Sequence, residues 1–178
     1  MMTPQEIRKL RLKNDYKEMV NIKGDIITWE AINGNVPYIE AYKVTLKIKG
    51  ITGKGPTYRD THIVNVKIPA DYPRVAPEVR MESQPVVFHP NWYRDGKWCF
   101  GTWIMSEGLG HHIVRMARTL QYDLEITNEE SPANREANSW FLKKKGGNIF
   151  PCDTQLLPDP TKEKMNFSMK PKKKFTIN

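Results

Sequence analysis

Residues 86–103 have the sequence VVFHPNWYRDGKWCFGTW, and the interpretation of the chain starts from this stretch. Cys99, one of only two cysteines, follows His89, Asn91 and an Asp95-Gly96 turn signal. A thiolate can attack a carbonyl carbon, and the oxyanion that forms needs a hydrogen-bond donor, which an asparagine amide can supply. Because Asn91 and Cys99 flank the turn, their side chains can meet. The stretch therefore indicates acyl chemistry at Cys99.

The composition is that of a globular chain with one core. Its 178 residues are 39% hydrophobic, which predicts a single domain with a tail. Two cysteines are too few for a disulfide scaffold. No apolar run approaches the roughly 18 residues of a membrane span, and no signal-peptide pattern is present. We therefore expect an intracellular, cytoplasmic protein without a membrane partner.

The positive charge is concentrated near the C-terminus. The formal net charge is +8, but residues 143–178 contain nine lysines against Asp153, Asp159 and Glu163. The rest of the chain is almost neutral. A basic tail on such a body does not match a nucleic-acid groove, so a nucleic-acid partner is not expected.

The N-terminal segment carries the signals of a helix start. Thr3 is placed as a cap, Pro4 takes the first helical position and Glu6 completes a capping box. The helix surface is basic and could be either a solvated face or a docking face; its cations are Arg8, Lys9, Arg11, Lys13 and Lys17.

Four strands are expected next, and together they predict an antiparallel meander. The first covers residues 26–32 and ends at the hairpin signal Asn33-Gly34. Apolar and polar residues then alternate cleanly over residues 42–49, which indicates a half-buried strand. Shorter strands follow at 64–68 and 79–81, separated by Pro69, Pro73 and Pro77.

Helices return after the cysteine. Ile113, Ala117, Leu120 and Leu124 share one face of a helix predicted over residues 111–124. Ser131-Pro132 is predicted to begin a further helix, with Ser131 as its cap. We therefore expect an α+β domain over residues 1–148 and a lysine-rich extension over 149–178. This extension is predicted to be partly docked or disordered, and its possible packing residues are Leu156, Leu157 and Phe167.

Several motifs occur in a characteristic order: Ile68-Pro69-Ala70-Asp71-Tyr72-Pro73, His89-Pro90-Asn91, Gly96-Lys97-Trp98-Cys99 and Ser131-Pro132-Ala133-Asn134. With the order of the predicted helices and strands, they resemble the ubiquitin-conjugating enzyme family, the middle component of ubiquitin transfer. The resemblance covers about residues 3–145. It implies the family's α+β fold, with two helices after the cysteine loop, and an aminoacyltransferase activity that needs no cofactor or metal.

The resemblance also implies roles for individual residues. Cys99 would receive the C-terminus of a ubiquitin-like protein from an activating enzyme, and Asn91 would stabilise the oxyanion when a lysine amine attacks. Ser131 falls where the family keeps an Asp or Ser that gates the incoming lysine. His89 and Pro90 would brace the loop. The basic first helix would dock the activating enzyme through Arg8, Lys9, Arg11 and Lys13.

Other interpretations stay open. Cys99 could be a buried small apolar residue, Asn91 a loop tie and Ser131 only a helix cap. A Cys-His hydrolase with His89 as base is a rival, although residues after Cys99 do not resemble a helix start. A zinc site from His111, His112, Cys99 and Cys152 lacks paired-ligand spacing. A non-catalytic binding module of the same fold is the further alternative.

The chain also departs from the common eukaryotic pattern. Arg74 stands where a bulky apolar residue grips a RING-type ligase, and residues 106–110 replace the usual second gripping loop. Gly146-Gly147 and the lysine-rich tail stand in place of a fourth helix. These differences indicate a divergent member, resembling those of bacterial or archaeal ubiquitin-like conjugation systems. Whether such a member needs a ligase is left open by the sequence.

Overall fold

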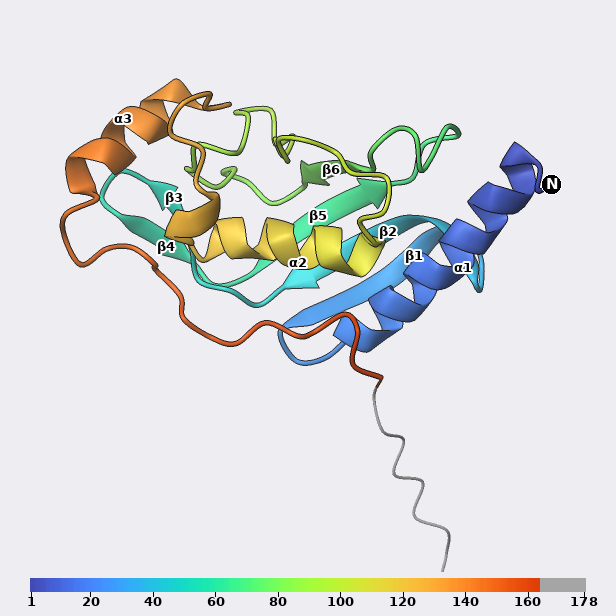
Figure 1. Ribbon diagram of the computed structural model, residues 1–178. Coiled ribbons are helices and arrows are strands. Elements are labelled where there is room, and N and C mark those ends of the chain that lie inside the picture. The colour runs from blue at the N-terminus through green and yellow to red at the C-terminus, as the bar shows by residue number, and fades with distance from the viewer. Residues whose placement is uncertain (164–178) are drawn as a thin grey trace, which may run out of the picture.

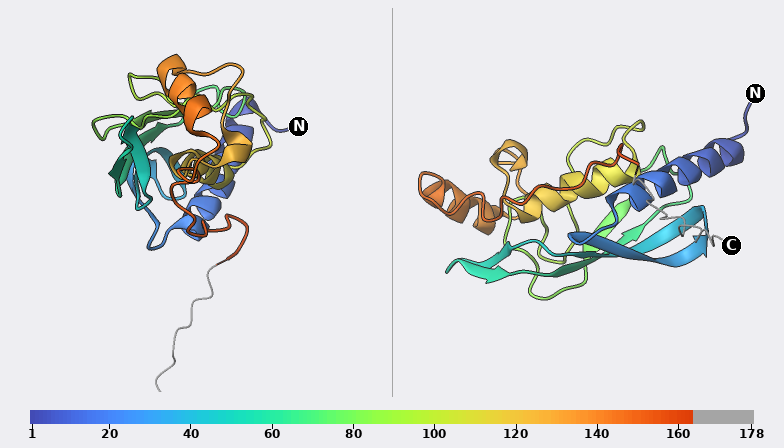
Figure 2. Two further views of the ribbon diagram at one scale, coloured as in Figure 1. Left: turned by 90° about the vertical axis from the view of Figure 1, so that its left-hand side faces the viewer. Right: turned by 90° about the horizontal axis from the view of Figure 1, so that it is seen from below.

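A four-stranded antiparallel sheet with helices packed on one face forms the framework of the molecule (Figure 1). The computed structural model describes residues 1–163. Figure 2 shows the helices α1 and α2 side by side above the sheet, so the main core lies between these two layers. The elements in chain order are α1 (Pro4–Ile22), β1 (Ile27–Asn35), β2 (Tyr38–Leu46), β3 (Gly50–Gly53), β4 (Thr57–Arg59), β5 (His62–Lys67), β6 (Glu78–Met81), α2 (Leu109–Leu120), a 3₁₀ turn (Leu124–Ile126) and α3 (Arg135–Lys144).

The sheet confirms the predicted meander, with strand order β1-β2-β5-β6 and antiparallel pairing throughout. Val44 of β2 pairs with Val64 of β5, and both side chains are fully buried beneath the helices. Apolar residues alternate with polar ones because only one face of the sheet is covered. The sheet therefore forms as the alternation predicted, except that β2 covers Tyr38–Leu46 and not residues 42–49.

The first hairpin differs from the prediction. Asn33-Gly34 does not end the strand; it forms an irregular, bulged step inside the β1–β2 pairing, and the turn lies at Val36-Pro37. Gly34 has φ +89°, and a Cβ there would collide with the carbonyl oxygen of Tyr38. The glycine is thus required for a bulge and not for a two-residue turn. The small β3–β4 hairpin, which contains several glycines, was not predicted.

Helix α1 begins as its capping box predicts. Glu6 N–H donates to the Thr3 hydroxyl and Thr3 N–H donates to the Glu6 carboxylate. Its buried face carries Asp15, which accepts hydrogen bonds from Arg11, the Tyr72 hydroxyl and the backbone N–H of Leu109. A buried carboxylate is tolerated only when it is paired in this way. Asp15 therefore ties α1 to the start of α2.

Two helix limits need correction. Helix α2 ends at Leu120 and not at 124, since Tyr122 adopts φ 59° and Leu124 is 45% exposed. Helix α3 is capped by Asn134, whose side chain accepts from the N–H of Ala137, and not by Ser131. The buried face of α3 belongs to a second core cluster, formed by Ile51, Tyr122, Trp140, Phe141 and Phe150.

The segment after α3 runs along the body as an extended strap toward the end of α1 (Figure 1). Phe150 is buried in the second cluster, and Leu157 packs against the main core, whereas Leu156 is 90% exposed. The packing expected of Leu157 is therefore confirmed, and that of Leu156 is wrong. Phe167 lies outside the described residues. The expected boundary at 148 thus falls just before a packed residue.

Candidate active site

Cys99 lies at the end of a short hairpin that starts at Asn91. The backbone N–H of Cys99 donates to the carbonyl oxygen of Asn91 at 2.8 Å, and Tyr93 N–H donates to Lys97 O at 2.9 Å. The turn depends on Gly96, which has φ +92°; a Cβ there would stand 2.8 Å from the carbonyl oxygen of Met81. The Asp95-Gly96 turn signal is therefore confirmed, and this turn places Asn91 opposite Cys99.

The hairpin is held to the core by its tryptophans. Trp92 and Trp98 face each other across the hairpin and are buried. The indole N–H of Trp92 donates to the hydroxyl of Thr119 on α2 at 2.8 Å. Cys99 follows directly after Trp98 and is only half-buried. The buried indoles fix the loop, and the thiol lies within reach of a partner.

The Asn91 side chain ties a second loop to the hairpin. Its Oδ1 accepts from the N–H of Asn128 at 2.9 Å, and its Nδ2 donates to the carbonyl oxygen of Ile126 at 2.7 Å. An amide NH₂ has two hydrogens, and within residues 1–163 only one of them has a protein acceptor. The second hydrogen therefore has no partner among the described residues. Bracing and oxyanion stabilisation are therefore compatible in this geometry.

Asn91 and Cys99 line one hollow of about 220 Å³. Its other walls come from the cysteine loop, α2 and the loop after it, namely Trp98, Phe100, Gly101, Arg115, Thr119, Ile126 and Asn128. Ser131, the predicted gating residue, is exposed and not part of this wall. It is linked to the hollow through Asn128, whose Oδ1 accepts from Ser131 N–H at 3.0 Å.

Asn128 and Tyr93 are site residues that the sequence reasoning missed. The bond from Ser131 N–H to Asn128 is local, but the bond from Asn128 N–H to Asn91 joins residues far apart in the sequence and leaves no local signal. The side chain of Tyr93 is 43% exposed and lies beside Cys99. The negative charge of a Cys99 thiolate raises the pKa of Tyr93 above its usual value, so the hydroxyl stays protonated beside the thiol.

His89 is a buried structural group. The residue is 1% exposed, its Nδ1 accepts from Asn91 N–H at 2.9 Å, and the centre of its ring lies 4.2 Å from that of the Tyr122 ring, with the two rings tilted by 50°. Burial lowers the pKa of His89 to about 3, so the imidazole is neutral at physiological pH. Pro90 contributes its carbonyl oxygen, which accepts from Ala133 N–H at 2.7 Å. Both residues thus have contacts suited to bracing the loop.

Cys152 differs from Cys99 in its surroundings. Its Sγ lies 3.1 Å from the carbonyl oxygen of Lys49 and 3.3 Å from that of Leu120. Burial raises the pKa of the Cys152 thiol to about 12, which leaves it protonated and unreactive at neutral pH. Of the two thiols, Cys99 is the one that lines a hollow together with an asparagine side chain. No group of side chains suited to a metal ion occurs within residues 1–163.

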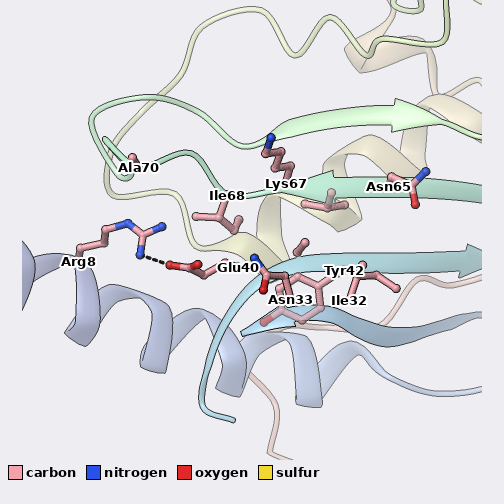
Figure 3. A pocket seen from close by; sticks show the side chains of 11 residues that line it. Arg8, Ile32, Asn33, Glu40, Tyr42, Asn65, Lys67, Ile68 and Ala70 are labelled. Carbon is pink, nitrogen blue, oxygen red and sulfur yellow. Dashed lines mark hydrogen bonds and ion pairs between the residues drawn. The ribbon is translucent and has the colours of Figure 1, made fainter. Parts of the chain in front are cut away.

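The predicted docking residues of α1 divide into two pairs. Arg8 turns toward the sheet and pairs with Glu40 at 2.6 Å, in a groove that also includes Asn33, Lys67 and Ala70 (Figure 3). Arg11 is bound to Asp15 and to the carbonyl oxygens of Met105 and Glu107. Lys9 and Lys13 are exposed. Of these four residues, Lys9 and Lys13 are therefore the two that form no ion pair with a described residue, and the Lys9 ammonium lies 5.4 Å from the centre of the Tyr38 ring.

Arg74 lies at the rim of a groove between α1 and the loop after β5. Its side chain is 76% exposed and pairs with Asp71 at 3.1 Å. The same groove includes Ile7, Tyr72 and Met105. Arg74, which stands where an apolar residue that contacts a ligase was expected, is therefore an exposed cation on a surface of apolar and charged residues.

Comparisons with known proteins identify the family and the fold. A family model described as "Ubiquitin-conjugating enzyme" matches residues 11–147. The structure of human ubiquitin-conjugating enzyme E2 G1 is similar in fold, with a TM-score of 0.50 and 16% sequence identity over 67% of this chain and 98% of that one. A search of curated protein sequences gave no significant match. Among the described residues, no helix is both long and apolar enough to cross a membrane.

Proposed function

Because the chain belongs to the ubiquitin-conjugating enzyme family, we propose that Cys99 carries a ubiquitin-like protein as a thioester and passes it to an amine. Members of this family work with ubiquitin-like proteins, activating enzymes and ligases. The observation that carries the proposal is the shared hollow in which Asn91 and a half-buried Cys99 stand together.

Loading is a thioester exchange. The Cys99 thiolate attacks the carbonyl carbon of the thioester on the activating enzyme, and a tetrahedral intermediate forms. Its collapse breaks the old carbon–sulfur bond, so the activating enzyme leaves as a thiolate and the acyl group remains on Cys99. The step needs no oxidant and no cofactor. We propose that Lys9 and Lys13 contribute to docking the activating enzyme, because their charges are exposed while those of Arg8 and Arg11 are paired.

Transfer makes a different demand on the site. A neutral amine attacks the thioester carbon, and negative charge develops on the carbonyl oxygen. The free N–H of Asn91 can stabilise this charge while its other contacts keep the amide fixed. Collapse forms an amide bond and expels the Cys99 thiolate, and the proton lost by the amine balances the charge. Ser131 would act on the incoming amine only from the rim, through the loop held by Asn128.

The two rival functions lack this support. A Cys-His hydrolase needs a histidine that can take a proton from the thiol, whereas His89 is buried and its Nδ1 is occupied by Asn91 N–H. A non-catalytic binding module has no need of a reachable cysteine beside a polar hollow. We propose a cytoplasmic location for the protein and a divergent, prokaryotic-type conjugation system as its setting, in line with the altered ligase-facing residues.

The proposal is tested by incubating the full chain with a ubiquitin-like protein, its activating enzyme and ATP. We expect an adduct that dithiothreitol removes, because thioesters exchange with free thiols. A binding module would give no covalent adduct. A hydrolase would release the ubiquitin-like protein from its thioester to water, without any added amine. Either result would refute the transferase function.

A further inference from the structure

We propose that Arg115 is a positioning residue that restrains Trp98 and Phe100, the two residues on either side of Cys99, for acyl transfer. The inference rests on the proposed function, since it concerns how the nucleophile and its thioester are oriented. Arg115 lies on α2, far from Cys99 in sequence, yet it lines the same hollow.

Arg115 contacts both chain neighbours of Cys99. Its Nη1 donates to the carbonyl oxygen of Phe100 at 2.6 Å, and its guanidinium carbon lies 5.2 Å from the centre of the Trp98 ring. The first contact fixes the peptide between Phe100 and Gly101, one residue beyond Cys99. The second is a cation–π contact with the residue that precedes it. One side chain therefore restrains the loop on each side of the thiol.

Glu107 holds the guanidinium from the opposite side. Arg115 Nε donates to one carboxylate oxygen at 2.8 Å, and Nη2 donates to the other at 2.9 Å. Burial raises the pKa of Glu107, but hydrogen bonds from His112 and Arg115 outweigh it and lower this pKa to about 2. The carboxylate is thus ionised, and the bidentate pair fixes the plane of the guanidinium.

Aromatic rings fill the space beneath this arrangement. The buried His112 ring lies 4.8 Å from the Trp98 ring, 5.6 Å from that of Phe100 and 5.1 Å from that of Trp103. The side chains of Trp98 and Phe100 therefore rest on a packed surface, while Arg115 contacts the Trp98 ring and the Phe100 carbonyl oxygen. Both chain neighbours of Cys99 are thus held in place.

This geometry matters because transfer needs the thioester carbonyl to lie within hydrogen-bond reach of Asn91. Displacements of about 1 Å in such an arrangement can cost up to about 10²-fold in rate. A lysine would keep the positive charge at this position, but it lacks the planar fork that bonds Glu107 and Phe100 together. The proposal thus depends on the shape of the arginine and not only on its charge.

The test uses the full chain charged with a ubiquitin-like protein and followed during discharge to free lysine. The variants are Arg115→Met and Arg115→Lys, with Arg118→Met as a matched control. Arg118 stands on the same helix and is paired with Asp123 and Glu125, away from residues 98–100. We expect both Arg115 variants to lower the maximal discharge rate about tenfold, with little change in the lysine concentration at half-saturation.

Two further measurements separate positioning from stability. Alkylation of Cys99 by iodoacetamide and the melting temperature should change no more in the Arg115 variants than in Arg118→Met. Wild-type discharge rates in Arg115→Met, or full rescue by Arg115→Lys, would overturn the proposal. A rate loss that merely follows the loss of folded protein would also overturn it. If the wild-type chain forms no thioester, the proposed function itself has failed, and the inference falls with it.

Discussion

The backbone N–H of Cys99 donates to the carbonyl oxygen of Asn91 over 2.8 Å, so the nucleophile and its expected oxyanion donor are joined by the main chain of one hairpin. Any movement of the hairpin carries both residues together. The orientation of the two side chains is then set by the side chains around them, and each of these contacts can be tested by substitution.

Substitution of the two cysteines should separate their roles. Cys99→Ser should trap an adduct that resists dithiothreitol, because a serine hydroxyl forms an ester, and Cys99→Ala should form none. Cys152→Ala should still load, since the Cys152 thiol is protonated and turned toward backbone carbonyls. Non-reducing gels with and without dithiothreitol measure the adduct. A reducible adduct that survives in Cys99→Ala and disappears in Cys152→Ala would exclude Cys99 as the acceptor.

Asn91 should affect transfer more than loading. Asn91→Ala removes an oxyanion donor, and we expect lysine discharge to slow by roughly 10²-fold. The matched control is Asn128→Ala, which leaves Asn91 in place but removes the side chain that bonds Ser131. Single-turnover discharge measures the rate of transfer, and thermal melting measures the stability of the loop and the fold. If Asn91→Ala discharges at the wild-type rate but melts at a lower temperature, Asn91 serves only to brace the loop.

The sheet, the first helix and the order of the motifs could be predicted because their signals are local. Alternation from Tyr42 to Ile48 fixes which face is buried, and Thr3 with Glu6 fixes where α1 begins. The Asp95-Gly96 signal likewise marked the hairpin that presents Cys99. Such signals depend on neighbouring residues alone, so one sequence is enough to detect them.

The remaining features depend on contacts between distant residues. Ser131 and Asn134 are both good caps in isolation. The carbonyl oxygen of Pro90 decides between them, because it accepts from both Ala133 and Asn134 N–H and sets where the helix starts. Similarly, Asn128 enters the site only through its bond to Asn91, and Arg115 only because α2 passes beside the cysteine loop. No local pattern contains these pairings.

Stability should fall as the pH drops below about 6.5 because His62, His89 and His112 are buried and burial lowers the pKa of each imidazole. Burial lowers the pKa of His62 to about 4 and that of His89 to about 3, from an ordinary value of 6.5. The unfolded chain therefore binds more protons than the folded one in this window, and acid favours unfolding. Each histidine should lower the free energy of unfolding by about 1.4 kcal/mol per pH unit between 6.5 and its folded pKa.

Urea denaturation across the range from about pH 5 to about pH 8 measures this effect. We expect nearly constant stability above pH 7 and a steady loss below 6.5. A free energy of unfolding that stays level down to about pH 5 would show that His62 and His89 gain protons without unfolding the chain.

Truncation of the C-terminal extension should be tolerated after Glu163 but not after Asn148. Truncation after Asn148 removes Phe150 from the second cluster, and loss of a buried phenylalanine typically costs about 3 kcal/mol or more. Truncation after Glu163 keeps all described contacts and should leave thioester formation intact. Phe150→Ala should reproduce much of the first effect, whereas Leu156→Ala, at a side chain 90% exposed, should not. Equal melting temperatures for the two truncations would restore the boundary at 148.

Arg74 should make the chain insensitive to RING-type ligases evolved for ordinary conjugating enzymes. Such ligases bind an apolar side chain of the conjugating enzyme. Burial of a guanidinium that lacks a matching acid would cost on the order of several kcal/mol. Asp71 already pairs with Arg74, but both side chains are largely exposed, so burial of the pair would require the desolvation of two charges. The altered loop at residues 106–110 should weaken ligase binding at this surface further. Both differences favour transfer without a separate ligase. The test adds a promiscuous RING domain to the charged protein and times discharge to free lysine. We expect no acceleration of discharge with Arg74. In Arg74→Phe, the RING domain should accelerate discharge in part. Strong acceleration with Arg74 intact would show that the cation does not block the surface, and that a ligase can use it as it stands.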